Sequence, residues 1–165
     1  MGQKISAQIK YYDYVESPIG PLFLAGCTRY LRLLGFSQGS HARAPGADWQ
    51  KDETRFALAK AQLAAYFAGE LKRFDLALKP EGTAFQMAAW AALQNIPYGE
   101  TRSYGQQAAM IGNPKAARAI GGANNANPIP VIIPCHRVIG AGGALTGFGG
   151  GLKTKAFLLG LEGAL

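Results

Sequence analysis

The sequence is poor in cysteine and has no long apolar run. Its 165 residues include only two cysteines, Cys27 and Cys135, which are too few for a disulfide framework and leave a metal site short of ligands. No apolar stretch approaches the roughly 18 residues of a membrane span, and the first residues lead into no signal-peptide core. We therefore expect a cytoplasmic protein with no metal and no cofactor.

Charged side chains are also scarce. Asp, Glu, Lys and Arg make up 16% of the chain against 48% hydrophobic residues, which excludes disordered and fibrous classes and indicates a packed globular protein. The net charge of +7 favours an anionic partner. Because 11 of the 17 basic and 7 of the 10 acidic residues precede Pro80, the basic excess is not gathered in a tail. Any affinity for nucleic acid must come from the placement of individual residues.

The first half of the chain, residues 1–79, has the pattern of a small antiparallel sheet with one helix. Runs of β-branched, aromatic and leucine residues between turn signals predict strands at residues 5–14, 22–36 and 71–78. Apolar residues recur at helical spacing before Gly69, which can end a helix, at Phe56, Ala59, Leu63 and Phe67. Residues 79–82 are expected to link this half to the next.

The second half, residues 80–165, is expected to be mainly helical. Thr83 can cap a first helix, which Pro97 ends. One face of that helix carries the apolar residues Phe85, Ala88, Ala92 and Ile96. We interpret Trp90 in this helix, and Trp49 in the first half, as packing residues.

Two shorter helices are predicted at residues 104–110 and 115–123, separated by the tight turn 111–113, with Pro114 at the first position of the second helix. Helix, three-residue turn, helix is the spacing of a helix-turn-helix, although such pairs also serve as plain packing. The second helix is built of alanine and glycine, with Arg118 as its one large polar side chain. Such a helix can approach a nucleic-acid backbone closely while Arg118 reaches into the duplex.

Cys135 and His136 stand side by side after an apolar, strand-like run. A thiol is a nucleophile as its thiolate, so a reactive cysteine needs a base nearby, and the other histidine, His41, lies far away in a loop rich in proline and glycine. Neighbours on a strand point to opposite faces, so we expect His136 to act on Cys135 through a water molecule or a bend in the chain. The alternative is that Cys135 is a small buried residue that ends a core strand.

Residues 140–151 contain too much glycine for a regular element. They lack the Gly-Lys-Ser/Thr ending of a phosphate loop. The many glycines are better explained by a backbone that lies close to a flat ligand. A short helix is expected at residues 152–161, with Glu162 at its end. Glu162 is either solvated surface or the third group that orients the His136 imidazole.

Three blocks of this half, in this order, resemble the O6-alkylguanine-DNA alkyltransferases, also called methylated-DNA--protein-cysteine methyltransferases. The most specific block is Pro134-Cys135-His136-Arg137-Val138, and the others are residues 112–119 and 150–162. The resemblance covers residues 80–165 strongly and the first half only in outline. It implies an α+β fold, with a ribonuclease H-like domain of sheet and helix at residues 1–79 and a helical domain with a helix-turn-helix at residues 80–165.

The resemblance also implies a function in DNA repair. Such a protein, expected to be a monomer in the cytoplasm or at a bacterial nucleoid, flips O6-alkylguanine out of double-stranded DNA and transfers the alkyl group irreversibly to its own Cys135. Each molecule acts once, because water does not hydrolyse the thioether product. Whether O4-alkylthymine is also a substrate is left open.

Individual roles follow from the same resemblance. His136 acts as base through a bridging water, Glu162 is its hydrogen-bond partner, and Asn127 is a hinge between the recognition helix and the active site. Tyr104 helps to rotate the target phosphate and donates to guanine N3, and Arg118 fills the space of the extruded base.

Further residues are assigned to binding. Contacts with DNA are expected at Asn113, Ala117, Gly121 and Gly122. The guanine pocket is expected to include Phe148, the Val138 carbonyl and the Gly149 amide. Relatives with a structural zinc supply several Cys and His ligands, whereas here only Cys27 and His41 remain, so no metal is predicted.

Two other functions compete with this hypothesis. Alkyltransferase-like proteins bind DNA on the same scaffold but lack the acceptor cysteine, and the presence of Cys135 argues against them. A cysteine hydrolase could use Cys135, His136 and Glu162 as well, but it would turn over small esters or peptides many times.

Overall fold

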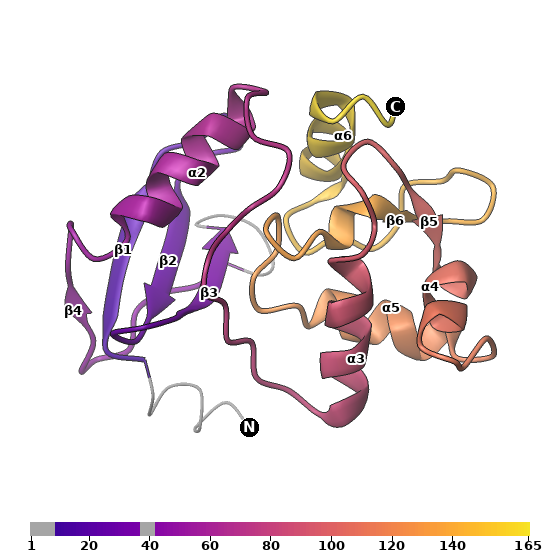
Figure 1. Ribbon diagram of the computed structural model, residues 1–165, viewed down its shortest axis with the longest axis horizontal. Coiled ribbons are helices and arrows are strands. Elements are labelled where there is room, and N and C mark those ends of the chain that lie inside the picture. The colour runs from indigo at the N-terminus through magenta and orange to yellow at the C-terminus, as the bar shows by residue number, and fades with distance from the viewer. Residues whose placement is uncertain (1–8, 37–41) are drawn as a thin grey trace. The chain divides into compact units, whose positions relative to one another are not determined.

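The computed structural model describes residues 9–36 and 42–165, and it divides into two compact units, Met1–Glu81 and Gly82–Leu165. Helices and strands occur in both units, which confirms the α+β class (Figure 1). His41 and the start of the first predicted strand lie outside the described residues. No helix in the described parts of the chain is long and apolar enough to cross a membrane.

The N-terminal unit contains a four-stranded sheet in the order β3-β2-β1-β4. Its strands are β1 Tyr11–Val15, β2 Leu22–Gly26, β3 Leu31–Phe36 and β4 Gln50–Lys51. The first three strands pair antiparallel, as the sequence predicted, but the stretch predicted as one strand at residues 22–36 forms the two strands β2 and β3. Strand β4 pairs with β1 in parallel, so the sheet is mixed.

The strand predicted at residues 71–78 is wrong. Only Leu78 makes an isolated bridge, with Leu31 of β3. The Gln62 side chain accepts from the Asp75 backbone N–H at 2.8 Å and donates to the Asp75 carbonyl at 2.9 Å. Because a side chain satisfies these backbone groups, the segment needs no strand partner there.

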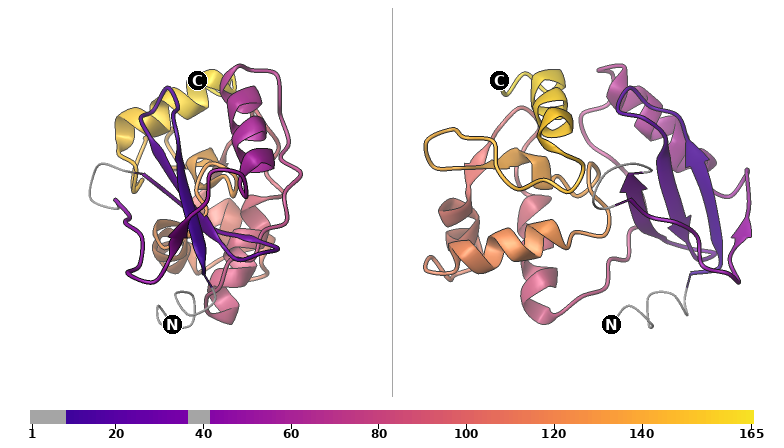
Figure 2. Two further views of the ribbon diagram at one scale, coloured as in Figure 1. Left: turned by 90° about the vertical axis from the view of Figure 1, so that its left-hand side faces the viewer. Right: turned by 180° about the vertical axis from the view of Figure 1, so that it is seen from behind.

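Helix α2 (Ala57–Phe67) lies along one face of this sheet (Figures 1 and 2). Lys60 of α2 forms an ion pair with Asp13 of β1, whose register partner in β2 is Leu24, so the Asp13 face of the sheet is the one that α2 covers. Of the four expected apolar contacts, Phe56, Ala59 and Leu63 are buried, but Tyr66 is the fourth buried residue instead of Phe67.

The C-terminal unit is mainly helical. Its elements are α3 Ala84–Leu93, β5 Arg102–Ser103, α4 Tyr104–Met110, α5 Ala117–Asn125, the 3-10 turn η1 Cys135–Arg137, β6 Val138–Ile139 and α6 Leu152–Leu161. Helices α3, α4 and α5 pack through a cluster of mostly small residues, Ala89, Ala108, Ile120 and Ala123. The short strands β5 and β6 pair in parallel, which places the end of η1 beside the start of α4.

The structure of this unit differs from the predictions in three details. Helix α3 buries Ala89 and leaves Ala88 exposed. Helix α5 starts at Ala117, three residues beyond Pro114, because residues 114 and 115 form a turn. The apolar run that ends at Ile133 is buried without being a strand, and Cys135 opens a 3-10 turn.

Both tryptophans pack as expected. Trp90 is buried in the C-terminal unit, where its Nε1 donates to the Ala123 carbonyl of α5 at 2.8 Å. Trp49 stacks on Phe23 in the N-terminal unit, with 6.3 Å between the ring centroids.

Candidate active site and DNA-binding helices

The 3-10 turn η1 places Cys135, His136 and Arg137 on one tight piece of buried backbone. This turn stands where the sequence predicted a strand with alternating side chains. A bend in the chain was one of the two ways in which we expected His136 to act on Cys135, and the turn provides such a bend. Cys135 is 8% exposed and His136 is fully buried. His136 Nε2 lies 2.7 Å from Glu162 Oε2, and both side chains are fully buried.

The tautomer of His136 follows from this contact. A carboxylate only accepts hydrogen bonds, so Nε2 carries the proton that it donates to Glu162, and the lone pair of the neutral ring lies on Nδ1. Nδ1 is buried and has no hydrogen-bond partner among residues 9–36 and 42–165. The ring therefore offers one buried basic nitrogen that can accept a proton.

Arg137 completes the environment of Glu162, and sequence reasoning missed this role. Its Nε donates to Glu162 Oε1 at 2.8 Å and its Nη2 donates to Oε2 at 3.1 Å, while Nη1 donates to the Ile96 carbonyl at 2.7 Å. A two-pronged guanidinium of this kind stabilises the ionised carboxylate. Glu162 is therefore buried structure at the end of α6, and the solvated-surface alternative is wrong.

Burial and the neighbouring groups shift the pKa of Cys135 in opposite directions. Burial raises the pKa of the Cys135 thiol, and this effect exceeds the lowering by a hydrogen bond from Asn127 and by the charge of Lys155. Burial likewise lowers the pKa of His136, although Glu162 acts to raise it. The resting site therefore holds a neutral thiol beside a neutral imidazole.

Asn127 ties the end of α5 to the chain that leads into the turn. Its Nδ2 donates to the Ile133 carbonyl at 2.7 Å, and its Oδ1 accepts from the Ile129 N–H at 3.0 Å. The segment from α5 to Cys135 is thereby fixed by one buried side chain. Asn127 thus links helix α5 to the segment that leads to the Cys135 thiol.

Lys155 is a fully buried residue of the site that the sequence analysis missed. Its Nζ donates to the Val138 carbonyl at 2.6 Å and to the Thr146 carbonyl at 2.7 Å. Burial lowers the pKa of Lys155, while Cys135 acts to raise it. A signal was available, because Lys155 falls on the helical stripe that also contains Leu158, Leu159 and Glu162.

Helices α4 and α5 form the predicted helix-turn-helix. The Ser103 side chain accepts from the Gln106 N–H, whose own side chain returns to the Ser103 N–H, so α4 starts with a capping box. Gly112 ends the helix with φ of 77°, a conformation that glycine adopts without strain. Arg118 lies exposed in the first turn of α5.

The other residues expected at DNA lie around the same turn and helix. Asn113 and Gly122 are exposed, and Ala117 and Gly121 are half-buried. A Cβ on Gly121 would lie 3.9 Å from the Tyr104 ring, an ordinary van der Waals distance, so Gly121 faces the start of α4 without crowding it.

A buried amide pair, Gln107 and Asn124, joins the two helices and was not foreseen. Gln107 Nε2 donates to Asn124 Oδ1 at 2.9 Å, Asn124 Nδ2 donates to Gln107 Oε1 at 2.8 Å, and Gln107 Nε2 also reaches the Ala89 carbonyl at 3.1 Å. Both amides are thus paired away from water. The pair fixes the angle between α4 and α5.

The residues expected at the guanine lie on the segment after η1. Val138 is buried in β6, and Phe148 and Gly149 are half-buried in the glycine-rich loop. Tyr104 is half-buried at the start of α4, and its hydroxyl donates to the Thr146 carbonyl at 3.1 Å. These residues share the C-terminal unit with Cys135.

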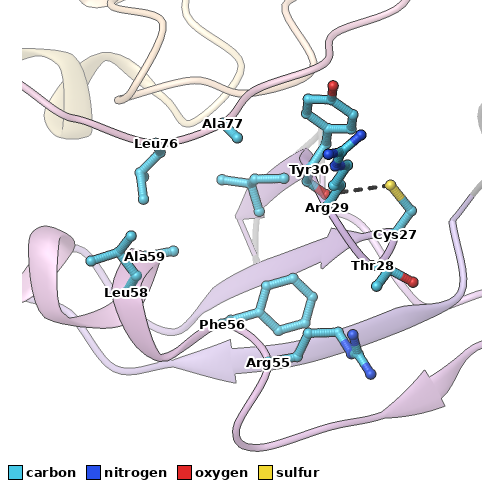
Figure 3. Close-up of a pocket in the computed structure, with 11 residues that line it drawn as sticks. Cys27, Thr28, Arg29, Tyr30, Arg55, Phe56, Leu58, Ala59, Leu76 and Ala77 are labelled. Atoms are coloured by element: carbon cyan, nitrogen blue, oxygen red, sulfur yellow. Dashed lines mark hydrogen bonds between the residues drawn. The ribbon is translucent and has the colours of Figure 1, made fainter.

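Cys27 has a different environment in the N-terminal unit. It lines a cavity of about 160 Å³ together with Tyr30, Arg55 and Phe56, and its Sγ lies 4.0 Å from the Tyr30 carbonyl (Figure 3). Burial acts to raise the pKa of Cys27, but backbone hydrogen bonds at Arg29 and Tyr30 together with other contacts bring it below the usual value. Within the described ranges, no three His, Cys, Asp or Glu side chains are grouped to hold a metal ion.

The fold and the site together define a class of two-part α+β proteins. In this class a unit of sheet and helix is followed by a helical unit, which contains a helix-turn-helix and a buried Cys-His-Glu arrangement. Two family models match the chain. Residues 10–80 match the ribonuclease-like domain of 6-O-methylguanine DNA methyltransferase, and residues 84–164 match its DNA binding domain. The chain belongs to the 6-O-methylguanine DNA methyltransferase family, as the resemblance predicted.

Curated relatives and solved structures agree. The methylated-DNA--protein-cysteine methyltransferase of Methanosarcina acetivorans is 56% identical over 93% of this chain and 99% of its own. The protein of the same name from Mycobacterium tuberculosis is 53% identical over 92% of each. The crystal structure of Mycobacterium tuberculosis OGT in complex with DNA matches with a TM-score of 0.88 and 52% identity, over 93% of each chain.

Proposed function

We propose that this protein repairs O6-alkylguanine in duplex DNA by moving the alkyl group to the Cys135 sulfur, once per molecule. Membership of the family and the names of its relatives make it a methylated-DNA--protein-cysteine methyltransferase, a DNA-repair enzyme that binds DNA. The observation that carries the Cys135 assignment is the buried contact between His136 Nε2 and Glu162, which leaves Nδ1 as the only basic nitrogen in the turn that contains the thiol.

The proton moves first in this mechanism. His136 Nδ1 accepts the Cys135 proton through a bridging water, and Glu162 stabilises the imidazolium that results. Arg137 keeps Glu162 ionised, so the carboxylate orients the ring without taking up the proton. Because burial disfavours a standing thiolate, the anion forms when the substrate is in place, helped by Asn127 and Lys155.

The alkyl group then moves in a single displacement. The thiolate forms the S–C bond, the C–O6 bond breaks, and its electron pair goes to the guanine. No tetrahedral intermediate forms, so the site needs donors for the leaving guanine only. Tyr104 and the Gly149 amide supply these donors, while the Val138 carbonyl and Phe148 hold the base.

DNA reaches this site through the helix-turn-helix. The surface of α5, with Ala117, Gly121 and Gly122, lies against the duplex, and Asn113 contacts it from the turn. The target base is flipped out, and Arg118 fills the gap that it leaves. Flipping costs a few kcal/mol, and this cost is smaller for an alkylated base because its base pair is weaker. Asn127 couples the position of α5 to the thiol.

The remaining expectations belong to the same proposal. Residues 80–165 carry the DNA contacts and the chemistry, residues 1–79 form the other domain, and the protein works as a monomer in the cytoplasm without metal or cofactor. A cysteine hydrolase would use the same three side chains but would release product and react again.

Substitution of the relay tests the proposal. His136→Ala removes the base, so the single-turnover rate constant with an O6-methylguanine duplex should fall about 10²- to 10⁴-fold. Glu162→Gln should give a smaller loss, because the ring remains but its charged partner is gone. The matched control is Cys27→Ser in the other unit, which should react as the unmutated protein does. The relay is wrong if His136→Ala reacts at the unmutated rate.

A further inference from the structure

Thr146 makes two contacts with Tyr104 that the proposed mechanism does not use. The Tyr104 hydroxyl lies 3.1 Å from the Thr146 carbonyl and 3.2 Å from the Thr146 hydroxyl. Thr146 is exposed in the glycine-rich loop, and Tyr104 is half-buried. One loop residue therefore presents both an acceptor and a second hydroxyl to the same phenol.

The position of Thr146 is fixed by a buried cation. Lys155 Nζ donates to the Thr146 carbonyl at 2.7 Å and to the Val138 carbonyl at 2.6 Å. Val138 directly follows the turn that contains Cys135. A continuous series of hydrogen bonds thus runs from the Tyr104 phenol through Thr146 and Lys155 to Val138. The Thr146 carbonyl thus accepts from both Lys155 and Tyr104, although the residue is exposed.

The chemistry of these groups decides where the protons lie. A carbonyl only accepts, so the hydrogen bond to the Thr146 carbonyl uses the Tyr104 proton. The phenol oxygen then keeps its lone pairs, and the Thr146 hydroxyl can donate to them. If the phenol turns its proton to another acceptor, the Thr146 hydroxyl can go on donating, and a phenol that accepts a hydrogen bond is a stronger donor.

We propose that Thr146 is a positioning residue for Tyr104 in alkyl transfer. Its hydroxyl holds the phenol oxygen while the phenol proton turns from the Thr146 carbonyl to a ring nitrogen of the leaving guanine. The bond changes are those of the displacement itself, S–C formed and C–O6 broken with its electron pair on guanine, and Thr146 neither gains nor loses a proton. This assignment rests on the proposed role of Tyr104.

The test compares two substitutions of Thr146 with saturating O6-methylguanine duplex. Thr146→Val removes the hydroxyl and keeps the shape and the carbonyl, so the single-turnover rate constant should fall about 3- to 10-fold, as expected for one hydrogen bond. Thr146→Ser keeps a hydroxyl and should restore most of the rate. DNA affinity and melting temperature should not change in either variant, nor should any property in the matched control Thr28→Val.

A double-mutant cycle with Tyr104→Phe separates positioning from general loop structure. In the Tyr104→Phe background, Thr146→Val should have no further effect, because the phenol oxygen on which it acts is absent. An equal loss in both backgrounds, or no loss in the single variant, overturns the role of Thr146 and leaves the proposed function standing. Absence of methyl transfer to Cys135 in the unmutated protein overturns both.

Discussion

At the scale of single residues, the site is a set of buried charges that stabilise one another. Arg137 neutralises Glu162, and Glu162 fixes the His136 ring with its lone pair on Nδ1. An isolated buried charge would be costly, whereas each of these groups has a hydrogen-bond partner of opposite charge or a carbonyl. The neutral imidazole is what the proposed proton transfer from Cys135 requires.

The pH dependence of the reaction follows from His136. Burial lowers the pKa of His136 below its ordinary value of 6.5, so the neutral, basic form persists as the pH falls past 6.5. The single-turnover rate should therefore hold down to pH 6.5 and decline only below it. A midpoint of rate loss above pH 6.5 would contradict the assignment of His136 as base.

The same shift has a consequence for stability. In the unfolded chain, His136 takes up a proton near pH 6.5, whereas the folded state resists it, so the free energy of unfolding should fall as the pH drops below 6.5. Urea titrations of the unmutated protein and of His136→Ala, at matched pH values, measure this contribution by difference.

Sequence reasoning found the residues that carry a chemical signature and missed the residues that support them. Cys135, His136 and Glu162 were named as a set because a thiol, a base and a carboxylate form a recognisable combination. Arg137 and Lys155 were overlooked because a basic residue in a sequence is by default a solvated one, although the place of Lys155 on the apolar stripe of α6 was a signal that it is buried. Thr146 carries no signal in the sequence at all.

At the scale of helices and strands, local signals predicted the elements well where a cap was present. The Thr83 and Ser103 capping boxes start α3 and α4 where the sequence placed them. Errors occurred where longer-range contacts decide. The run that ends at Ile133 has the composition of a strand, but the Asn127 side chain bonds its backbone and holds it in a turn.

The amide pair between α4 and α5 should be necessary for a rigid helix-turn-helix. Gln107→Leu would leave the buried Asn124 amide without its partner, so the protein should lose about 1–3 kcal/mol of stability, measured by urea unfolding. Affinity for duplex DNA should also fall, because the angle between the two helices is no longer fixed.

The matched control for this prediction is Gln94→Leu, the same exchange at an exposed glutamine that follows α3. It should change neither stability nor DNA affinity. Equal stability of the Gln107→Leu and Gln94→Leu variants would show that the amide pair is dispensable.

At the scale of the whole molecule, the residues that we propose for DNA binding and for chemistry belong to the same unit. The segment from Lys79 to Gly82, expected to be a linker, contains the division between the two compact units. The net charge of +7 gives general attraction to DNA, but it cannot place a base in the pocket. In the proposed function, that step depends on α5 and its one long polar side chain, Arg118.

Flipping and chemistry can be separated through Arg118. Arg118→Ala should slow repair of duplex DNA strongly and slow the reaction with a free guanine analogue such as O6-benzylguanine only slightly, because a free base needs no flipping. If Arg118 only contacts a phosphate, Arg118→Ala should instead lower DNA affinity and reduce the slope of log affinity against log salt concentration by about one. Equal losses on both substrates would mean that Arg118 supports the pocket itself.

We propose above all that Cys135 accepts one alkyl group and that the protein then stops reacting. Cys27 is the competing acceptor, because it is the more exposed cysteine and its pKa lies below the usual value, whereas the pKa of Cys135 is raised. The most direct measurement is the intact mass of the protein after reaction with excess O6-methylguanine duplex, followed by mapping of the modified peptide. We expect one added methyl group per molecule, on Cys135. Methyl on Cys27, or release of product with repeated turnover, would contradict it.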